Sequence, residues 1–379
     1  MPTTIWSYPT RILFGAGSAK SCGPEAKALG LDRVLLVTDA GVINAGLTKP
    51  IEAALAAEGI SVAVFSELSS NPTEAEVEAG AAAYRASQAR GAVAVGGGAP
   101  MDVAKLIVLR SKVANSFEEL DDAKGGDRFI PRDLPPVITV PTTAGTGSEI
   151  GRAAVLTVKS TGTKTVVFAP SMLPRVAILD PELTVSLPKG PTAATGFDAL
   201  THCLEAYLAK GDHPLADSIA LGGLELIARY LPRVIQNGSD LEARGAMLKA
   251  AMMGAAAFQK GLGACHSLSH PLSAELGLHH GLANALCLPA VVDFNEATVP
   301  ERVQRIGGIF GAPPEPGACA RRLKELREQV GISGGLAQAG VTQERIGRLA
   351  QLALQDGCHG GNPRPCREED FRAMYTASL

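Results

Sequence analysis

The clearest sign of how the chain folds is Ala92-Val-Ala-Val-Gly-Gly-Gly-Ala-Pro-Met-Asp-Val-Ala-Lys105. It predicts a short apolar strand over 92–95, a glycine turn over 96–98 and a helix over about 100–110. Glycines at such a turn let a phosphate approach the backbone, and the helix N-terminus offers it unpaired N–H groups. The stretch satisfies neither the G-x-G-x-x-G nor the Walker fingerprint, so it indicates an anion-binding turn of another kind.

The same alternation of strand and helix extends to both sides of this stretch. Apolar runs alternate with segments of helical spacing, which predicts a parallel sheet with helices on its faces. The strands are expected at 34–38, 62–65, 92–95, 137–140 and up to Ile178, the helices at 46–58, 74–88 and 100–110, and a hairpin at 153–158 and 164–168 around Ser160-Thr-Gly162.

The hydrophobic pattern changes after Leu187-Pro188, because 192–379 consists of long Ala- and Leu-rich segments with a period near 3.6 residues. We therefore expect an α/β protein with a Rossmann-like parallel-sheet domain over 1–185 and an all-helical domain over 186–379. Within the helical part, breaks are predicted at Pro232, 261–263, Pro289, 313–317 and 362–365.

Composition limits the class of protein. Of 379 residues, 46% are hydrophobic and 19% are charged, and the formal net charge is −3, which excludes a disordered chain and a polycationic nucleic-acid binder. No apolar run reaches the roughly 18 residues that crossing a bilayer requires, and the first residues lack the pattern of a secretion signal. The seven cysteines form no CxxC pair. We expect a cytoplasmic protein with reduced thiols and with neither a nucleic-acid nor a membrane partner.

One pair of metal-ligand residues lies in a helical segment. Asp198 and His202 are four residues apart, so their side chains share a helix face about one turn apart. That spacing suits two ligands of one ion, but it also suits an ordinary i,i+4 surface pair. The pair alone leaves both interpretations open.

Histidines concentrate further along the chain, with four of seven between 266 and 280. His266 and His270 share a helical face, Pro271 and Gly277 are expected to interrupt the helix, and His280 begins a segment that can fold back. Three imidazoles and one carboxylate form a reasonable ligand set for Zn²⁺ or Fe²⁺. The alternative is that these histidines make ordinary hydrogen bonds.

Asp39 directly follows the strand expected at 34–38. A carboxylate there can accept a hydrogen bond from a ribose 2′-hydroxyl and repel a 2′-phosphate. It can equally be a helix N-cap. Gly15-Ala-Gly17 near the start lacks the third glycine of the dinucleotide fingerprint, and we give it no such role.

Taken together, ordered motifs along nearly the whole chain resemble the iron-containing, or group III, metal-dependent alcohol dehydrogenases, relatives of lactaldehyde reductase and 1,3-propanediol dehydrogenase. The resemblance is carried by Phe14-Gly-Ala-Gly17, Asn71-Pro-Thr73, Gly96-Gly-Gly-Ala-Pro-Met-Asp102, Pro141-Thr-Thr-Ala-Gly-Thr-Gly-Ser-Glu149, Asp180-Pro-Glu182, Gly196-Phe-Asp-Ala-Leu-Thr-His202, 266–284 and Asn362-Pro-Arg364.

The resemblance implies site residues and cofactors. The implied metal ligands are Asp198, His202, His266 and His280, for Fe²⁺ first and Zn²⁺ second. His270 is implied to lie near the nicotinamide and the substrate, as a proton relay or as a group that orients a ligand. The implied NAD-binding residues are Asp39, Asn71, Gly97, Gly98, Ala99, Asp102, Thr142, Thr143, Thr146 and Lys164.

The implied reaction is hydride transfer between a nicotinamide and a small alcohol or carbonyl compound, in a homodimer or larger assembly. The metal would act as a Lewis acid on the substrate oxygen. Three alternatives remain: a maleylacetate-reductase-like enzyme without the metal site, a dehydroquinate-synthase-like lyase, and a non-catalytic protein that binds metal or nucleotide.

Substrate preference depends on residues outside these motifs. Gln259 and Lys260, just before the third implied ligand, could recognise a polar or anionic tail of the substrate. The alternative for Lys260 is a solvent-facing side chain. Ser273 and Gly151 depart from the family pattern without affecting the ligand set.

Overall fold

The computed structural model describes residues 10–159 and 163–379, so the expected hairpin turn at 160–162 lies outside the described residues. Within them the chain divides into two compact units. Of the described residues, the sheet unit comprises 10–143, 147–159 and 163–187, and the helical unit comprises 144–146 and 188–379.

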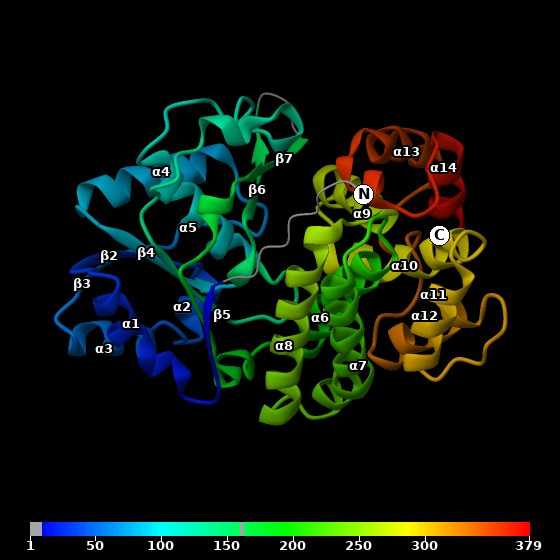
Figure 1. Ribbon diagram of the computed structural model, residues 1–379, viewed down its shortest axis with the longest axis horizontal. Helices are drawn as coiled ribbons and strands as arrows, with labels where there is room; N and C mark the ends of the chain where they lie inside the picture. The colour runs from blue at the N-terminus through cyan, green and yellow to red at the C-terminus, as the bar shows by residue number, and fades with distance from the viewer. Residues whose placement is uncertain (1–9, 160–162) are drawn as a thin grey trace. The chain divides into compact units, whose positions relative to one another are not determined.

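The sheet unit contains a six-stranded sheet in the order β1-β8-β5-β4-β2-β3, with every neighbouring pair parallel (Figure 1). A separate antiparallel hairpin pairs β6 with β7. The strands are β1 (Arg11–Phe14), β2 (Arg33–Val37), β3 (Ser61–Phe65), β4 (Gly91–Gly96), β5 (Val137–Pro141), β6 (Ala153–Val158), β7 (Thr163–Phe168) and β8 (Val176–Leu179).

Helices cover both faces of the sheet because the central strands are apolar on both sides. In β2, Leu35 and Val37 join the core beneath α4 and α5, whereas Val34 and Leu36 join the core beneath α1 and α3. This alternation follows from the two-residue period of a strand. The helices of this unit are α1 (Cys22–Ala28), α2 (Ala40–Asn44), α3 (Lys49–Ala57), α4 (Glu74–Ala86) and α5 (Gly98–Arg110).

The strand order reverses between β2 and β4. From β2 the chain moves outward to β3, then crosses back over β2 to β4. Right-handed crossovers in opposite directions place their helices on opposite faces, which opens a crevice at the carboxyl ends of the two strands. Asp39 follows the end of β2 and Gly97 follows the end of β4, so both lie at this switch point.

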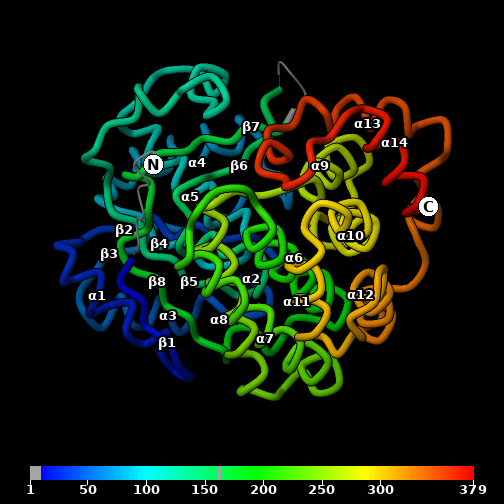
Figure 2. The backbone as a smooth tube through the Cα atoms, turned by 45° about the vertical axis from the view of Figure 1, so that its right-hand side comes forward, coloured from blue at the N-terminus to red at the C-terminus, as the bar shows by residue number. Residues whose placement is uncertain are grey.

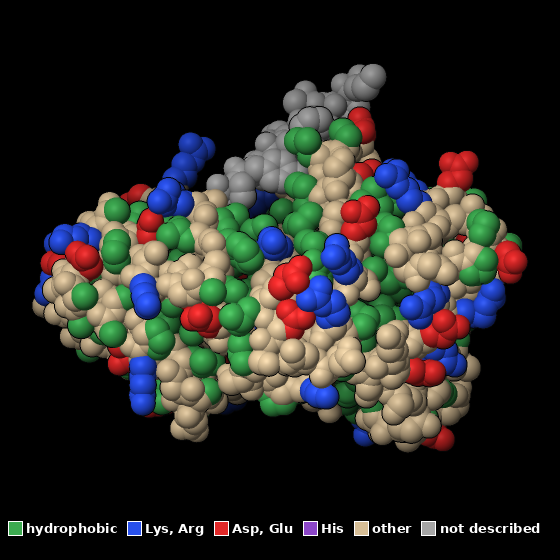
Figure 3. All heavy atoms as spheres, turned by 90° about the horizontal axis from the view of Figure 1, so that it is seen from below, with side chains coloured by type: hydrophobic (Ala, Val, Ile, Leu, Met, Phe, Trp, Pro, Cys, Tyr) green, Lys and Arg blue, Asp and Glu red, His purple; other side chains and the backbone are tan. Residues whose placement is uncertain are grey.

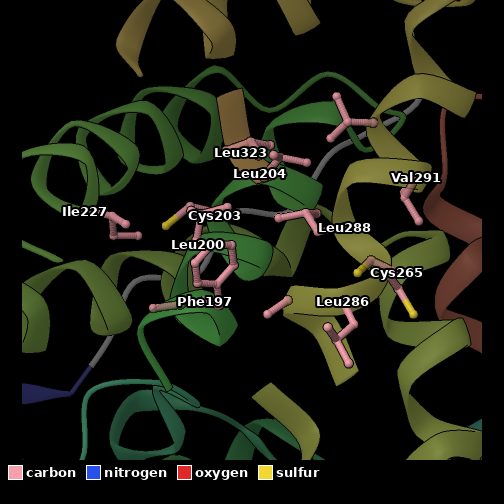
Figure 4. Close-up of a cluster of buried hydrophobic side chains, with 14 of the residues drawn as sticks. Phe197, Leu200, Cys203, Leu204, Ile227, Cys265, Leu286, Leu288, Val291 and Leu323 are labelled. Carbon is pink, nitrogen blue, oxygen red and sulfur yellow. The ribbon is translucent and has the colours of Figure 1, made fainter. Parts of the chain in front are cut away.

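The helical unit is built around α6, which packs against α7, α8 and α10 (Figure 2). Figure 4 shows Phe197, Leu200 and Cys203 of α6 among the buried side chains of neighbouring helices, including Leu286 and Leu288 of α10. The helices are α6 (Lys189–Leu208), α7 (Pro214–Gln236), α8 (Leu241–Ala257), α9 (Ala264–Leu276), α10 (His280–Glu296), α11 (Pro300–Ile309), α12 (Ala318–Gln329), α13 (Ile346–Gln355) and α14 (Glu368–Ala377).

The expected α/β class, with a parallel sheet followed by helices, is confirmed. The predicted helix breaks at Pro232, Pro271 and Pro289 are wrong, because α7, α9 and α10 continue through them. A proline removes one backbone hydrogen bond and crowds the preceding turn. In this unit, burial of the apolar faces on both sides of each proline outweighs that cost.

Two further elements differ from the sequence-based expectation. The helix expected over 46–58 is confirmed as α3, whereas α2, which begins directly after Asp39, was not predicted. Strand β1 was not predicted, because its mostly exposed side chains give no buried pattern. Backbone pairing with β8 holds it, and Asp180 accepts hydrogen bonds from the Gly17 N–H (3.2 Å) and the Ala19 N–H (2.9 Å) just beyond the strand.

The surface carries charges of both signs. On the face drawn in Figure 3, Lys and Arg side chains are interspersed with Asp and Glu side chains and with hydrophobic ones. Among the described residues, no helix is both long enough and apolar enough to cross a membrane.

Candidate functional site

Three helices of the helical unit bring together the four side chains that the sequence offered as metal ligands. Asp198 and His202 lie on α6, His266 lies in the first turn of α9, and His280 is the first residue of α10. Gly281 allows this approach, since a Cβ added there would lie 2.2 Å from the Ala194 carbonyl oxygen of α6. The start of α10 is therefore held directly against the helix that carries the carboxylate.

One oxygen of Asp198 is the centre of the cluster. Its Oδ1 lies 3.9 Å from His202 Nδ1, 4.0 Å from His266 Nε2 and 3.5 Å from His280 Nε2. Two ligands at tetrahedral positions, each about 2.1 Å from an ion, are separated by about 3.4 Å. The three histidine nitrogens thus lie near the distance from this oxygen that ligands of one small cation would have. Ligand atoms of Asp198, His202 and His266 all lie within 4.8 Å of one another, whereas His280 lies outside this tighter group.

Within the described part of the chain, two imidazole nitrogens of the cluster lack a hydrogen-bond partner, and a bound cation would coordinate each of them. His202 Nδ1 and His266 Nε2 are buried and have no hydrogen-bond partner among the described residues. A buried polar atom without a partner costs about 1–3 kcal/mol. Burial is the main cause that lowers the pKa of His202 to about 4, so its imidazole is neutral and keeps the lone pair that metal binding needs.

Two further side chains orient the cluster, and no role was predicted for either of them. Glu205 Oε2 accepts from His266 Nδ1 at 2.5 Å, and its Oε1 accepts from the Cys265 N–H at 2.6 Å. Asn284 Nδ2 donates to Asp198 Oδ1 at 2.9 Å and lies 3.3 Å from His280 Nε2. Burial lowers the pKa of His266, but the Glu205 carboxylate outweighs burial, so this pKa is raised.

Glu205 could have been found from its spacing. Positions 198, 202 and 205 are i, i+4 and i+7 on one helix, and therefore share a face. Carboxylates that accept a hydrogen bond from the second nitrogen of a ligating histidine are usual around metal sites.

His270 lies one turn beyond His266 on α9, and its ring stacks on that of His280 with a centroid distance of 5.3 Å. Its Nδ1 is 2.7 Å from Asp356 Oδ2, in the segment after α13. Burial raises the pKa of Asp356, but His270 and the hydrogen bonds from Ser267 and Cys358 outweigh it and leave the pKa well below its usual range. The Asp356 carboxylate thus fixes the orientation of the His270 ring.

Cys358 is close to His270 and Asp356 as well, but these three residues already form hydrogen bonds with one another and their neighbours. Burial raises the pKa of the Cys358 thiol well above its usual value. Both oxygens of Asp356 already accept hydrogen bonds within the protein, so we propose no second metal site here.

The solvent-facing alternative for Lys260 is wrong, and the structure gives the side chain partners within the protein. Its Nζ lies 2.5 Å from Asp217 Oδ1 and donates to the Tyr207 carbonyl oxygen. Its side chain is only 1% exposed. Gln259 Nε2 donates to the Ala256 carbonyl oxygen one turn earlier. The ion pair, which joins residues 43 positions apart, had no signal in the local sequence.

Several nucleotide-site candidates of the sheet unit lie at the switch point. Asp39 is the N-cap of α2, where its Oδ1 accepts from the Val42 N–H at 3.0 Å, so the N-cap alternative is observed. Gly97 is the N-cap of α5, whose first residues are Gly98 and Ala99. Gly96 has φ +149°, and a Cβ there would lie 2.7 Å from Pro100, so this turn requires glycine.

The next strand end contributes to the same region. The Thr142 N–H donates to the Gly96 carbonyl oxygen at 2.9 Å, and the Thr143 side chain lies 3.3 Å from the place of a Cβ on Gly97. Both threonines therefore adjoin the glycine turn and the open N-terminus of α5.

The remaining candidates for cofactor binding lie in other parts of the chain. Asn71 lies in the segment between β3 and α4, Lys164 lies on β7 opposite Thr157, and Thr146 belongs to the helical unit. Asp102 lies on α5, but both of its carboxylate oxygens accept hydrogen bonds from the protein itself.

Comparison with known proteins places the chain in a family. Residues 9–181 match the family model of iron-containing alcohol dehydrogenase, and residues 192–379 match the model of the Fe-containing alcohol dehydrogenase family, C-terminal. The chain therefore belongs to the iron-containing alcohol dehydrogenases, as the motifs indicated, and it is an enzyme of the oxidoreductase class.

Individual relatives cover the full length. The 4-hydroxybutyrate dehydrogenase of Cupriavidus necator is 41% identical over 98% of this chain and 99% of its own. The NAD-dependent methanol dehydrogenase of Bacillus methanolicus is 36% identical over 99% of this chain and 100% of its own. The crystal structure of a 1,3-propanediol oxidoreductase superimposes with a TM-score of 0.95 at 33% identity, over 99% of this chain and 100% of that one.

Proposed function

We propose that this chain is an NAD(H)-linked alcohol dehydrogenase that depends on a divalent metal held by Asp198, His202, His266 and His280. The observation that carries the proposal is the buried cluster in which two imidazole nitrogens lack a partner around one carboxylate oxygen. When bound, the metal supplies Lewis acidity toward a substrate oxygen, and the nicotinamide accepts or donates the hydride.

The chain's own residues hold these groups and move the proton. Glu205 fixes the ring of His266 so that Nε2 faces Asp198, and Asn284 fixes the Asp198 carboxylate. His270 is the proposed proton relay, because its Nδ1 is held by Asp356 and its side chain is 18% exposed. Its other nitrogen is then the atom that can exchange a proton.

The proposed nucleotide site lies in the sheet unit. The N-terminus of α5 suits the pyrophosphate, since its first N–H groups lack partners within the helix and its glycine turn leaves room for a close approach. Asp39 suits a ribose hydroxyl in addition to its N-cap role, since among the described residues its Oδ2 has no hydrogen-bond partner. A carboxylate there favours NAD over NADP.

We propose a short alcohol or aldehyde as the substrate. The relatives are named for 4-hydroxybutyrate, methanol and 1,3-propanediol, so the family does not by itself fix the tail of the substrate. The pairing of Lys260 with Asp217 removes the residue that the sequence offered for an anionic tail.

The test is anaerobic reconstitution of EDTA-treated protein with Fe²⁺ or with Zn²⁺, followed by NADH oxidation with a panel of short aldehydes, ketones and oxo acids. The proposal expects activity that one of these metals restores and that NADPH supports less well than NADH. Turnover that needs no metal would instead favour a maleylacetate-reductase-like enzyme. Metal and NADH binding without turnover of any carbonyl compound would favour a non-catalytic protein.

A further inference from the structure

A fully buried lysine in the sheet unit has no place in the reaction described so far. Lys105 on α5 is 0% exposed, and its Nζ donates to Ser148 Oγ at 2.6 Å and to the Ala153 carbonyl oxygen at 2.9 Å. The same atom lies 3.4 Å from Asp102 Oδ1. All three ammonium donors are thus used inside the protein, and a lysine is rarely buried to this degree unless it is paired.

Asp102 has the same inward orientation. Its Oδ1 accepts from Ser148 Oγ at 2.5 Å, and its Oδ2 accepts from the Val155 N–H at 3.0 Å. Lys105 donates to the hydroxyl of Ser148, which in turn donates to Asp102, so one chain of charge-assisted hydrogen bonds links α5 to the turn at 148–150 and to β6. Such bonds are stronger than those between neutral groups.

A second buried carboxyl lies near the same lysine. Glu149 is 1% exposed, and its Oε1 has no hydrogen-bond partner among the described residues. Burial is the main cause that raises the pKa of Glu149 to about 7, and the nearby Lys105 opposes this shift. Thr139 of β5 also donates to the Glu149 carbonyl oxygen at 3.0 Å, which ties the turn to the sheet.

The linked turn closes the loop that leaves β5. This loop begins at Thr142, whose N–H is bonded to Gly96 of the glycine turn, and it ends at Ser148, which is bonded to α5. A loop fixed at both ends loses less conformational entropy when it binds a ligand, so its affinity is higher.

We infer that Asp102, Lys105 and Ser148 are positioning residues that hold the cofactor-binding turn and loop in place, and that Asp102 is not itself a ligand of the cofactor. The inference rests on the proposed binding of NAD by this unit, and it reassigns one residue that the resemblance placed among the NAD-binding groups. Ser148 distinguishes the two roles, because it supports Asp102 without being among the implied cofactor contacts.

The test compares the NADH Kd, measured by fluorescence titration, of wild-type protein with the variants Asp102→Asn, Ser148→Ala and the double variant. A positioning role predicts that Ser148→Ala alone raises Kd about tenfold, as expected for the loss of a hydrogen bond to a charged group. It also predicts that the double variant is no weaker than Asp102→Asn alone, because both changes break one network.

Steady-state kinetics of the metal-loaded enzyme give a second readout. The KM for NADH should rise in Ser148→Ala while kcat at saturating NADH and the metal content stay within twofold, a split that a general loss of stability would not produce. Ser111→Ala is the matched control, since it removes a serine hydroxyl bonded to the Val108 carbonyl oxygen at the other end of α5. It should leave the NADH Kd unchanged.

A Ser148→Ala variant with wild-type affinity, alongside a weakened Asp102→Asn, would overturn the inference and restore Asp102 as a direct ligand. Wild-type protein that binds no NADH would overturn the proposed function together with the inference.

Discussion

Replacing Glu205 by glutamine tests how the outer hydrogen bonds control the candidate metal centre. Both carboxylate oxygens of Glu205 accept hydrogen bonds, one from the Cys265 N–H and one from His266 Nδ1. Glutamine has the same shape but only one acceptor oxygen, so one of the two donors must face an NH₂ group. If that donor is His266, its proton moves to Nε2, the atom that faces Asp198.

The size of the effect follows from burial. The Glu205 side chain is 2% exposed, so no water can replace the lost acceptor. An unsatisfied buried donor costs about 1–3 kcal/mol, and changing the partner of a ligating histidine lowers metal affinity by about 10–100-fold. We therefore expect Glu205→Gln to fold, with a lower Tm, and to bind Fe²⁺ or Zn²⁺ at least about tenfold more weakly.

The assay is an anaerobic titration of metal against a chromophoric chelator that competes with the protein. Glu225→Gln is the matched control, because Glu225 is an exposed residue of α7. A Glu205→Gln variant whose metal Kd stays within twofold of the wild-type value would refute the role of Glu205 in orienting His266.

Three other substitutions give distinct readouts. Glu149→Gln should make the free energy of unfolding less dependent on pH. The pKa of the wild-type carboxyl is raised from 4.5 to about 7, so between these pH values the carboxyl keeps its proton in the folded state and loses it in the unfolded state. Its contribution to the free energy of unfolding therefore falls by about 3 kcal/mol as the pH rises through this range. Gly281→Ala should force α10 away from the Ala194 carbonyl oxygen, which costs about 1–3 kcal/mol in a packed interior and weakens metal binding. Lys260→Met should lower stability by about 2 kcal/mol through loss of the Asp217 pair, and change kcat/KM in the same proportion for charged and neutral alcohols.

For each of these three substitutions, one result would contradict the prediction. The free energy of unfolding can be measured with urea at several pH values from 4.5 to 7.5. If it changed with pH equally in wild type and Glu149→Gln, the raised pKa of the Glu149 carboxyl would be contradicted. Gly190→Ala is the control for Gly281→Ala, since a Cβ there meets no atom within 4 Å, and equal metal affinity in both variants would contradict the helix contact. A selective loss of activity toward 4-hydroxybutyrate in Lys260→Met would return that residue to the substrate site.

The sequence predicted the sheet unit well where strands are buried on both faces. The apolar run of β4 and its glycine turn have strong local causes, namely β-branched residues in the strand and a backbone position that only glycine accepts. Strand β1 has neither cause, because backbone pairing with β8 holds it and its side chains are mostly exposed. An edge strand of this kind gives no periodic signal.

The candidate site was predictable in its ligands but less so in their supports. Asp198 and His202 are neighbours on one helix, so spacing alone brings them together. Asp356 meets His270 across 86 positions, a pairing that depends on how the helices pack rather than on any local pattern. The prolines show the same limit, because packing of α9 on both sides of Pro271 outweighs the local preference for a break.

The most direct test of the central claim is the metal content of purified protein after anaerobic reconstitution with Fe²⁺ and removal of unbound metal. We predict about one ion per chain in the wild type and almost none in His202→Ala, with NADH binding retained, because the nucleotide site is proposed to lie in the sheet unit. A wild-type protein that holds no ion, or a His202→Ala variant that keeps the wild-type amount, would contradict it.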